Sequence, residues 1–132
     1  MNGSPHIVQY QGSKRKLAAQ ILFYMPKKFN RLIEPFSGMA AISIATAKDN
    51  KANSYILNDI NKPLISLLKE AINNPIRLYE DYKDVWESQL KYGENHTQHF
   101  YDVRDEFNNG KQTPANFLYL IARCVKGSVR YG

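Results

Sequence analysis

The sequence predicts an α/β protein with an attached helical region. Two short apolar runs, at 31–34 and 54–57, are typical of strands, and each is followed by a segment typical of a helix. This alternation indicates a parallel α/β unit with a right-handed crossover. The 132 residues are 43% hydrophobic and 23% charged, which are values of a globular chain with a core. We expect an α/β part over 1–73 and a helical region over 74–132.

The elements of the first part follow from their boundary residues. Ser13 is a helix-capping residue type and Pro26 cannot continue a helix, so the first helix is bounded on both sides. A turn over 35–38 separates the first strand from a helix of small residues. The expected elements are a helix over 14–24, a strand over 31–34, a helix over 39–47, a strand over 54–57 and a helix over 62–72.

The second part is expected to be helical throughout, over 76–90, 99–107 and 115–124. Asn74-Pro75 and Thr113-Pro114 each pair a capping residue with a proline suited to the first helical turn. Only two strands are visible in the whole chain. Sheets usually have about four to six strands, so two are few for a free-standing α/β domain.

Charge is arranged in blocks, with a net charge of +6 and a pI of about 9.4. Residues 1–33 hold six basic and no acidic side chains. Residues 34–106 hold eight basic and twelve acidic side chains, and the remaining residues hold four basic ones. Two basic ends therefore flank an acidic middle, a pattern that favours a polyanionic partner.

The chain has a single cysteine, Cys124. One thiol cannot form an internal disulfide framework, so we expect a reducing, cytoplasmic setting. The first residues lack the pattern of a signal peptide, and no apolar run is long enough to span a membrane. His96 and His99 lack a third ligand, so we expect surface histidines and no metal site. Cys124 and Trp86 are expected to pack within the helical region.

Three segments could form a ligand site. Gly38, in the turn after the first strand, would let the backbone approach a ligand beside a helix N-terminus. No Gly-Lys-Ser/Thr follows it, and the Gly-x-Gly-x-x-Gly pattern is incomplete. Asp59 ends the second strand, at the offset where an acid accepts hydrogen bonds from ribose hydroxyls. Together they indicate an adenosine-containing ligand, which can be a nicotinamide dinucleotide or S-adenosylmethionine.

The third segment, Tyr10-Gln11-Gly12-Ser13-Lys14, joins an aromatic ring, a flexible turn and a cation. An aromatic face and an ammonium group suit a ligand that carries a carboxylate. Taken alone, the segment also fits a capped surface helix.

Several blocks in order resemble the Dam-type (D12 class) N6-adenine DNA methyltransferases. They are Tyr10-Gln11-Gly12-Ser13-Lys14, Ile33-Glu34-Pro35-Phe36-Ser37-Gly38, Tyr55-Ile56-Leu57-Asn58-Asp59-Ile60-Asn61, Phe100 to Asn108, Phe117-Leu118-Tyr119-Leu120, and Gly127 with Arg130-Tyr131. The resemblance covers nearly the whole chain. It implies a partial Rossmann-like S-adenosylmethionine-dependent methyltransferase fold with an attached helical DNA-recognition region.

The resemblance also implies roles for individual residues. Its methyl donor is S-adenosylmethionine and its partner is double-stranded DNA. The donor-binding residues would be Tyr10, Lys14, Glu34, Pro35, Phe36, Gly38 and Asp59, and the DNA-binding residues would be Lys126 and Arg130. Three positions depart from the family pattern: Tyr10 stands where tryptophan is frequent, Ala40 replaces a second loop glycine, and Lys126 replaces a usual asparagine.

The catalytic motif of that family, Asp/Asn-Pro-Pro-aromatic, does not occur in these 132 residues. The motif holds the flipped adenine beside the donor, so we assign no catalytic residue. We expect the donor-binding and partial DNA-recognition portion of an adenine methyltransferase, which needs a second chain or self-associates. The alternatives are an inactive remnant that binds DNA or protein, and a piece of a nicotinamide-dependent oxidoreductase, which the incomplete glycine pattern disfavours.

Overall fold

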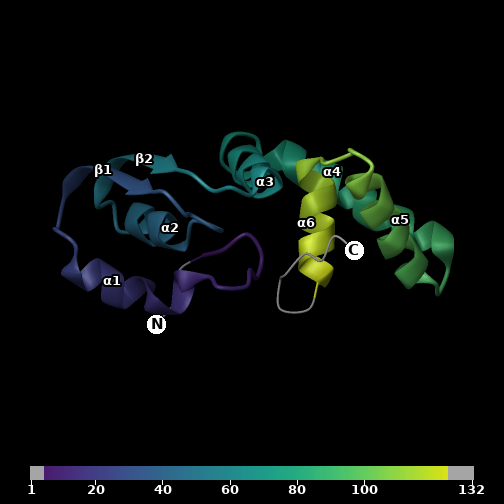
Figure 1. The fold of residues 1–132 in the computed structure, drawn as a ribbon, viewed down its shortest axis with the longest axis horizontal. Helices are drawn as coiled ribbons and strands as arrows, with labels where there is room; N and C mark the ends of the chain where they lie inside the picture. The colour runs from purple at the N-terminus through teal and green to yellow at the C-terminus, as the bar shows by residue number, and fades with distance from the viewer. Residues whose placement is uncertain (1–4, 125–132) are drawn as a thin grey trace. The chain divides into compact units, whose positions relative to one another are not determined.

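The structure, a computed structural model, describes residues 5–124 and separates into two compact units, Met1–Asn61 and Lys62–Gly132 (Figure 1). The division lies one helix earlier than the expected boundary at residue 73. The reason is that helix α3 (Lys62–Asn73) packs against α4 (Pro75–Ser88) and α6 (Pro114–Arg123), which belong to the second unit.

The first unit is a small parallel α/β unit, as the alternation of segments predicted. A 3-10 turn, η1 (Lys14–Leu17), leads into α1 (Ala18–Tyr24). The strands β1 (Phe29–Glu34) and β2 (Ala52–Leu57) pair in parallel, with Ile33 opposite Ile56, and α2 (Ala41–Lys48) connects them. Each strand is two residues longer at its start than expected.

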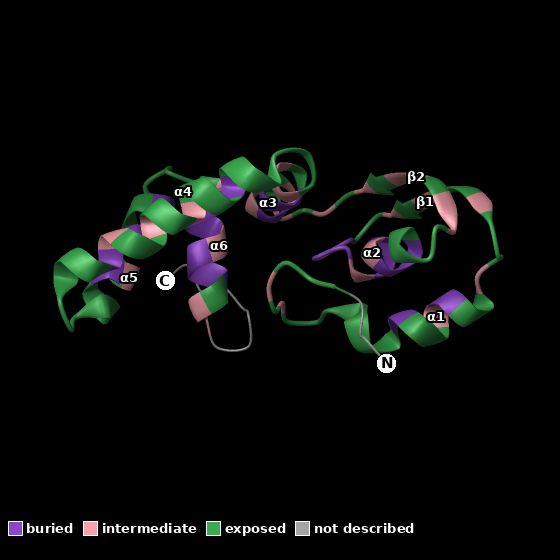
Figure 2. Ribbon diagram, turned by 180° about the vertical axis from the view of Figure 1, so that it is seen from behind, coloured by how far each residue is buried: buried purple, intermediate pink, exposed green. Residues whose placement is uncertain are grey.

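Helix α2 covers one face of this sheet, and α1 packs on the other side of α2 (Figure 1). Small residues in both helices allow close approach, and the shared core consists of Ala18, Leu22, Ile42 and Ala45. The opposite face of the sheet is open, since Ile33 is 57% exposed and Ile56 is 44% exposed (Figure 2).

The second unit is helical, consisting of α3, α4, the short η2 (Gln89–Tyr92), α5 (His96–Asn108) and α6. Helix α6 contacts α3, α4 and α5, so it is the centre of the unit. Its buried side chains include Phe117, Tyr119, Leu120 and Ile121. The ring of Phe117 stacks on that of Phe107 from α5, with centroids 5.8 Å apart.

Capping explains most of the helix boundaries here. The Thr113 side chain accepts a hydrogen bond from the Asn116 backbone N–H at 3.1 Å, as predicted. Asn95 caps α5 through Gln98, so α5 begins three residues before the expected start. Asn74 makes no capping bond, although Pro75 occupies the first turn of α4.

Two packing expectations need correction. Trp86 lies exposed on α4, and Cys124 is only half-buried at the end of α6. Both residues have apolar neighbours in the sequence, and this pattern led to the expectation. Cys124 follows the last buried position of α6, Ile121. Burial in this unit is therefore concentrated on α6 and on the helix faces that touch it.

Candidate functional site

A cavity of about 250 Å³ lies in the first unit, where the segment before α1 meets the turn after β1. Five of the seven residues expected to bind the donor line it: Tyr10, Lys14, Glu34, Phe36 and Gly38. The other lining residues are Gly12, Ser13, Ser37, Met39 and Ala41. Two sequence blocks about twenty residues apart therefore meet at one site, although Phe36 is itself 91% exposed.

Glu34 ends β1 and ties that strand to the first turn of α2. Its Oε2 accepts hydrogen bonds from the backbone N–H of Ser43, at 2.9 Å, and from the Ser43 hydroxyl. The carboxylate thus satisfies a free N–H group at a helix N-terminus, where negative charge is favoured. Sequence reasoning missed Ser43, because no motif links positions nine residues apart.

Two left-handed residues shape the turn between β1 and α2. Gly38 has φ +50° and Ala40 has φ +54°. A Cβ at Gly38 would lie 3.6 Å from Cε1 of Tyr10, so the glycine preserves the space between the turn and that ring. At Ala40 the left-handed backbone costs roughly 1–2 kcal/mol, and it delays the start of α2 to Ala41.

Asp59 and Pro35 support the turn without lining the cavity. Asp59 Oδ2 accepts a hydrogen bond from the Gly38 backbone N–H at 2.9 Å, and Oδ1 accepts one from Asn61 at 3.0 Å. The Pro35 carbonyl accepts a bond from the Asn58 side chain at 3.0 Å. The residue expected to hold a ribose is therefore fixed by the backbone of the turn that carries Gly38.

Lys14 supplies positive charge at the opposite wall. Its Nζ donates to the Gly12 carbonyl at 3.1 Å, within a turn closed by the bond from Ser13 N–H to the Tyr10 carbonyl. Across the described part of the chain, Lys14 forms no ion pair. The cavity therefore combines an uncompensated ammonium, a carboxylate and an aromatic ring.

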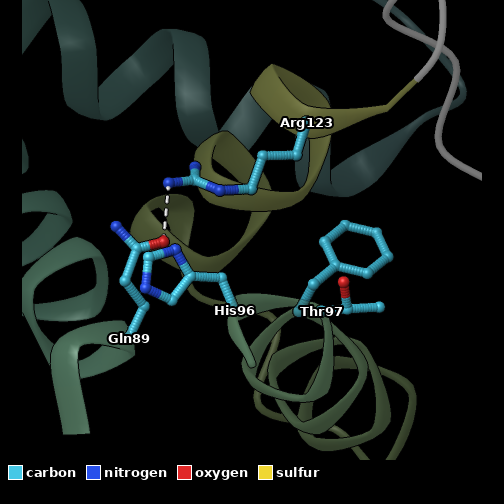
Figure 3. A pocket seen from close by; sticks show the side chains of 5 residues that line it. Gln89, His96, Thr97 and Arg123 are labelled. Carbon is cyan, nitrogen blue, oxygen red and sulfur yellow. Dashed lines mark hydrogen bonds between the residues drawn. The ribbon is translucent and has the colours of Figure 1, made fainter. Parts of the chain in front are cut away.

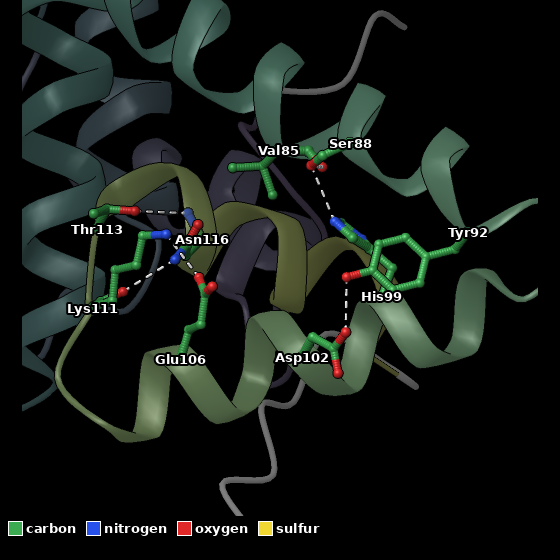
Figure 4. A network of polar contacts seen from close by, with 9 residues as sticks. All are labelled: Val85, Ser88, Tyr92, His99, Asp102, Glu106, Lys111, Thr113 and Asn116. Atoms are coloured by element: carbon green, nitrogen blue, oxygen red, sulfur yellow. Dashed lines mark hydrogen bonds and ion pairs between the residues drawn. The ribbon is translucent and has the colours of Figure 1, made fainter.

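The second unit contains a buried polar cluster that corrects the expectation of two surface histidines. His96 is exposed, but His99 is only 4% exposed. Its Nδ1 lies 2.8 Å from the Tyr119 hydroxyl. Its Nε2 lies 3.1 Å from Ser88 Oγ (Figure 4). The shared helical face of His99, Val103 and Phe107 is the signal that could have predicted this burial.

A second cavity, of about 340 Å³, adjoins this cluster and is lined by Gln89, His96, Thr97, Phe100 and Arg123 (Figure 3). The Arg123 guanidinium lies 3.7 Å from the centroid of the Tyr119 ring. No carboxylate in the described residues pairs with it. The expected DNA-binding residues Lys126 and Arg130 lie outside the described residues.

Residues 5–124 contain neither a metal-binding cluster nor a membrane-crossing helix. No three His, Cys, Asp or Glu side chains in this range gather as a metal site. No helix in the same range is long and apolar enough to cross a membrane.

The family model of the D12 class N6 adenine-specific DNA methyltransferases matches residues 10–132. The chain belongs to this family. The type II methyltransferase M.MjaIII of Methanocaldococcus jannaschii is 28% identical to it over 93% of this chain and 47% of its own length. The DNA adenine methylase of Haemophilus influenzae is 31% identical over 94% of this chain and 42% of its own length. The retron Ec67 DNA adenine methylase of Escherichia coli is 28% identical over 95% of this chain and 42% of its own length.

Family membership confirms the resemblance of the sequence blocks, and the D12 class implies S-adenosylmethionine as the methyl donor. The chain spans about half the length, or less, of these curated relatives. The described residues of this D12 class chain, a small parallel sheet with helices, are consistent with an α/β methyltransferase.

Proposed function

We propose that the first unit binds S-adenosylmethionine in the cavity between Tyr10 and Gly38, as the donor-binding portion of an adenine-N6 DNA methyltransferase. One observation carries this proposal: two blocks that are distant in the sequence, at 10–14 and 34–41, line one cavity in a chain of a methyltransferase family. Gly38 leaves space beside the Tyr10 ring, where a Cβ would make ordinary van der Waals contact.

The charges at the cavity match the chemistry of this donor. Lys14 would bind the carboxylate of S-adenosylmethionine. Glu34 would face the positively charged part of the same molecule. Asp59 retains lone pairs for ribose hydroxyls after accepting the two backbone bonds described above. When bound, S-adenosylmethionine supplies a methyl group activated by the attached sulfonium.

We propose that the second unit contributes to DNA binding. Lys126 and Arg130 are the expected contacts, and the geometry adds Arg123, whose charge is uncompensated among the described residues. A guanidinium on an aromatic ring at the edge of a cavity suits a DNA phosphate. The turn after β1, which includes Pro35 and Phe36, would contribute to donor binding and not to DNA binding.

Methyl transfer needs groups that these 132 residues do not contain. The Asp-Pro-Pro-Tyr segment of the family would hold the flipped adenine beside the donor. We propose that the Asp-Pro-Pro-Tyr segment is supplied from outside these 132 residues, for example by a second chain. A catalytically inactive module that binds DNA or protein is the alternative, favoured by the basic ends of the chain.

Calorimetric titration with S-adenosylmethionine tests the donor site. Lys14→Gln should weaken donor binding by about 2- to 5-fold, because an exposed charge pair contributes up to about 1 kcal/mol. Lys16→Gln removes the same charge from the same 3-10 turn but does not line the cavity, so it should bind as the wild type does. Equal affinities for all three proteins, or tighter binding of a nicotinamide dinucleotide, would contradict the proposal.

A salt titration with a DNA duplex tests the second unit. Phosphate contacts release counterions, so the logarithm of the binding constant should fall steeply with the logarithm of the salt concentration. Arg123→Ala should make this slope shallower by about 1, the share of one phosphate contact. A flat slope for the wild type would argue for a role without DNA.

A further inference from the structure

We propose that His99 is a positioning residue that fixes the Arg123 guanidinium at the edge of its cavity, acting through Tyr119. His99 and Arg123 each contact Tyr119, His99 through its Nδ1 and Arg123 through its guanidinium. The part of the proposal that concerns DNA affinity rests on the proposed function, whereas the positioning itself does not.

The direction of the hydrogen bonds follows from Ser88. The Ser88 hydroxyl donates to the Val85 carbonyl at 2.8 Å, so its oxygen is left to accept a bond from His99 Nε2–H at 3.1 Å. His99 is then a neutral imidazole with a lone pair on Nδ1. The Tyr119 hydroxyl donates to that lone pair at 2.8 Å.

This bond fixes a ring on which the cation lies. Tyr119 is fully buried, and the His99 ring meets it edge-on, with centroids 5.1 Å apart and an interplanar angle of 88°. Arg123 lies over the Tyr119 ring. Its Nη2 donates to Gln89 Oε1 at 3.3 Å (Figure 3). The guanidinium is therefore in contact with both Tyr119 and Gln89.

Protonation of His99 would disturb this arrangement. A proton on Nδ1 would point at the Tyr119 oxygen and displace the hydroxyl hydrogen toward Gln89 Oε1, 3.5 Å away. That oxygen is the acceptor used by Arg123. The groups facing or acting on His99 are Ser88 of α4, Tyr92 of η2, His96, Asp102 and Glu106 of α5, and Tyr119 and Arg123 of α6.

The two nitrogens of His99 can be tested separately in the 132-residue chain. His99→Asn keeps an acceptor near the position of Nδ1, whereas His99→Gln keeps a donor near the position of Nε2. Both variants are neutral amides, so they change the polarity of the buried site similarly. Ser88→Ala and Tyr119→Phe remove the two partners one at a time and serve if a His99 variant does not fold.

The first readout is the order of the Arg123 guanidinium in the chain without DNA, measured by NMR on its Nε–H group at pH 8. His99→Asn should retain the wild-type order, while His99→Gln and Tyr119→Phe should lose it. Equal loss in His99→Asn and His99→Gln would overturn the proposal, because it would indicate a packing role only.

The second readout is affinity for a DNA duplex, measured by fluorescence anisotropy. His99→Gln should weaken binding by about 3- to 10-fold, and the same change in an Arg123→Ala background should have no further effect. An additive effect would overturn the coupling. A chain that shows the NMR difference but does not bind DNA would support the positioning and contradict only the proposed DNA role.

Discussion

Two carboxylates, Glu34 and Asp59, set the shape of the turn beside the cavity between Tyr10 and Gly38. Both bind backbone N–H groups, Glu34 at Ser43 and Asp59 at Gly38, so each joins the end of a strand to the turn or to α2. The sequence predicted that these acids belong to the site. It could not predict their partners, because hydrogen bonds across nine and twenty-one residues depend on how the strands pair.

The buried His99 makes stability depend on pH. Burial and the nearby Arg123 lower the pKa of His99 below its usual range. The unfolded chain therefore binds this proton more readily, so stability falls as the pH drops from about 6.5 toward the lower folded pKa. Urea unfolding between pH 8 and pH 5 should show this loss in the wild type.

The matched variants for this prediction differ only in position. His99→Asn should remove part of the pH dependence below 6.5, because the group that titrates is gone. His96→Asn, on the exposed first turn of α5, should change it far less, because His96 is the weakest of the influences on His99. A wild-type stability that is constant across this range would contradict the assignment of a buried neutral imidazole.

At the scale of elements, capping separates two helices with similar sequence signals. Thr113 and Asn74 each precede a proline, but only Thr113 accepts a capping bond. Thr113→Ala should therefore lower the free energy of unfolding by about 1 kcal/mol, and Asn74→Ala by only a few tenths. Denaturant midpoints measure both, and equal losses would show that the caps do not differ.

Helices and strands were largely predictable because apolar periodicity and proline positions act locally. The starts of elements were less so. The Asn95 cap makes α5 begin earlier than expected. The left-handed Ala40 makes α2 begin later. Neither effect can be predicted from the spacing of apolar residues. The cavity of Arg123 was beyond prediction, since its side chains come from η2, α5 and α6.

At the scale of the whole molecule, the first unit leaves one face of its sheet uncovered. Ile33 and Ile56 are paired across the strands and exposed, and a two-stranded sheet has unpaired edges. Such surfaces tend to recruit another chain. We therefore predict that the wild-type chain self-associates as its concentration rises, as light scattering would show.

The substitution Ile33→Lys should reduce this association while changing the stability by only about 0.5 kcal/mol, as is usual for exposed positions. Ile72→Lys, on the exposed surface of α3 in the other unit, is the control and should leave the association unchanged. A wild-type chain that stays monomeric at all concentrations would contradict the prediction.

Calorimetry with S-adenosylmethionine tests whether the cavity between Tyr10 and Gly38 holds the methyl donor, as we propose. Gly38→Ala places a methyl group against the Tyr10 ring, whereas Gly110→Ala imposes a strained left-handed alanine where nothing lies within 4 Å. We predict that the wild type and Gly110→Ala bind the donor equally, and that Gly38→Ala binds it about tenfold more weakly, a loss of ~1.4 kcal/mol. No binding by the wild type, or equal binding by all three folded proteins, would contradict the claim.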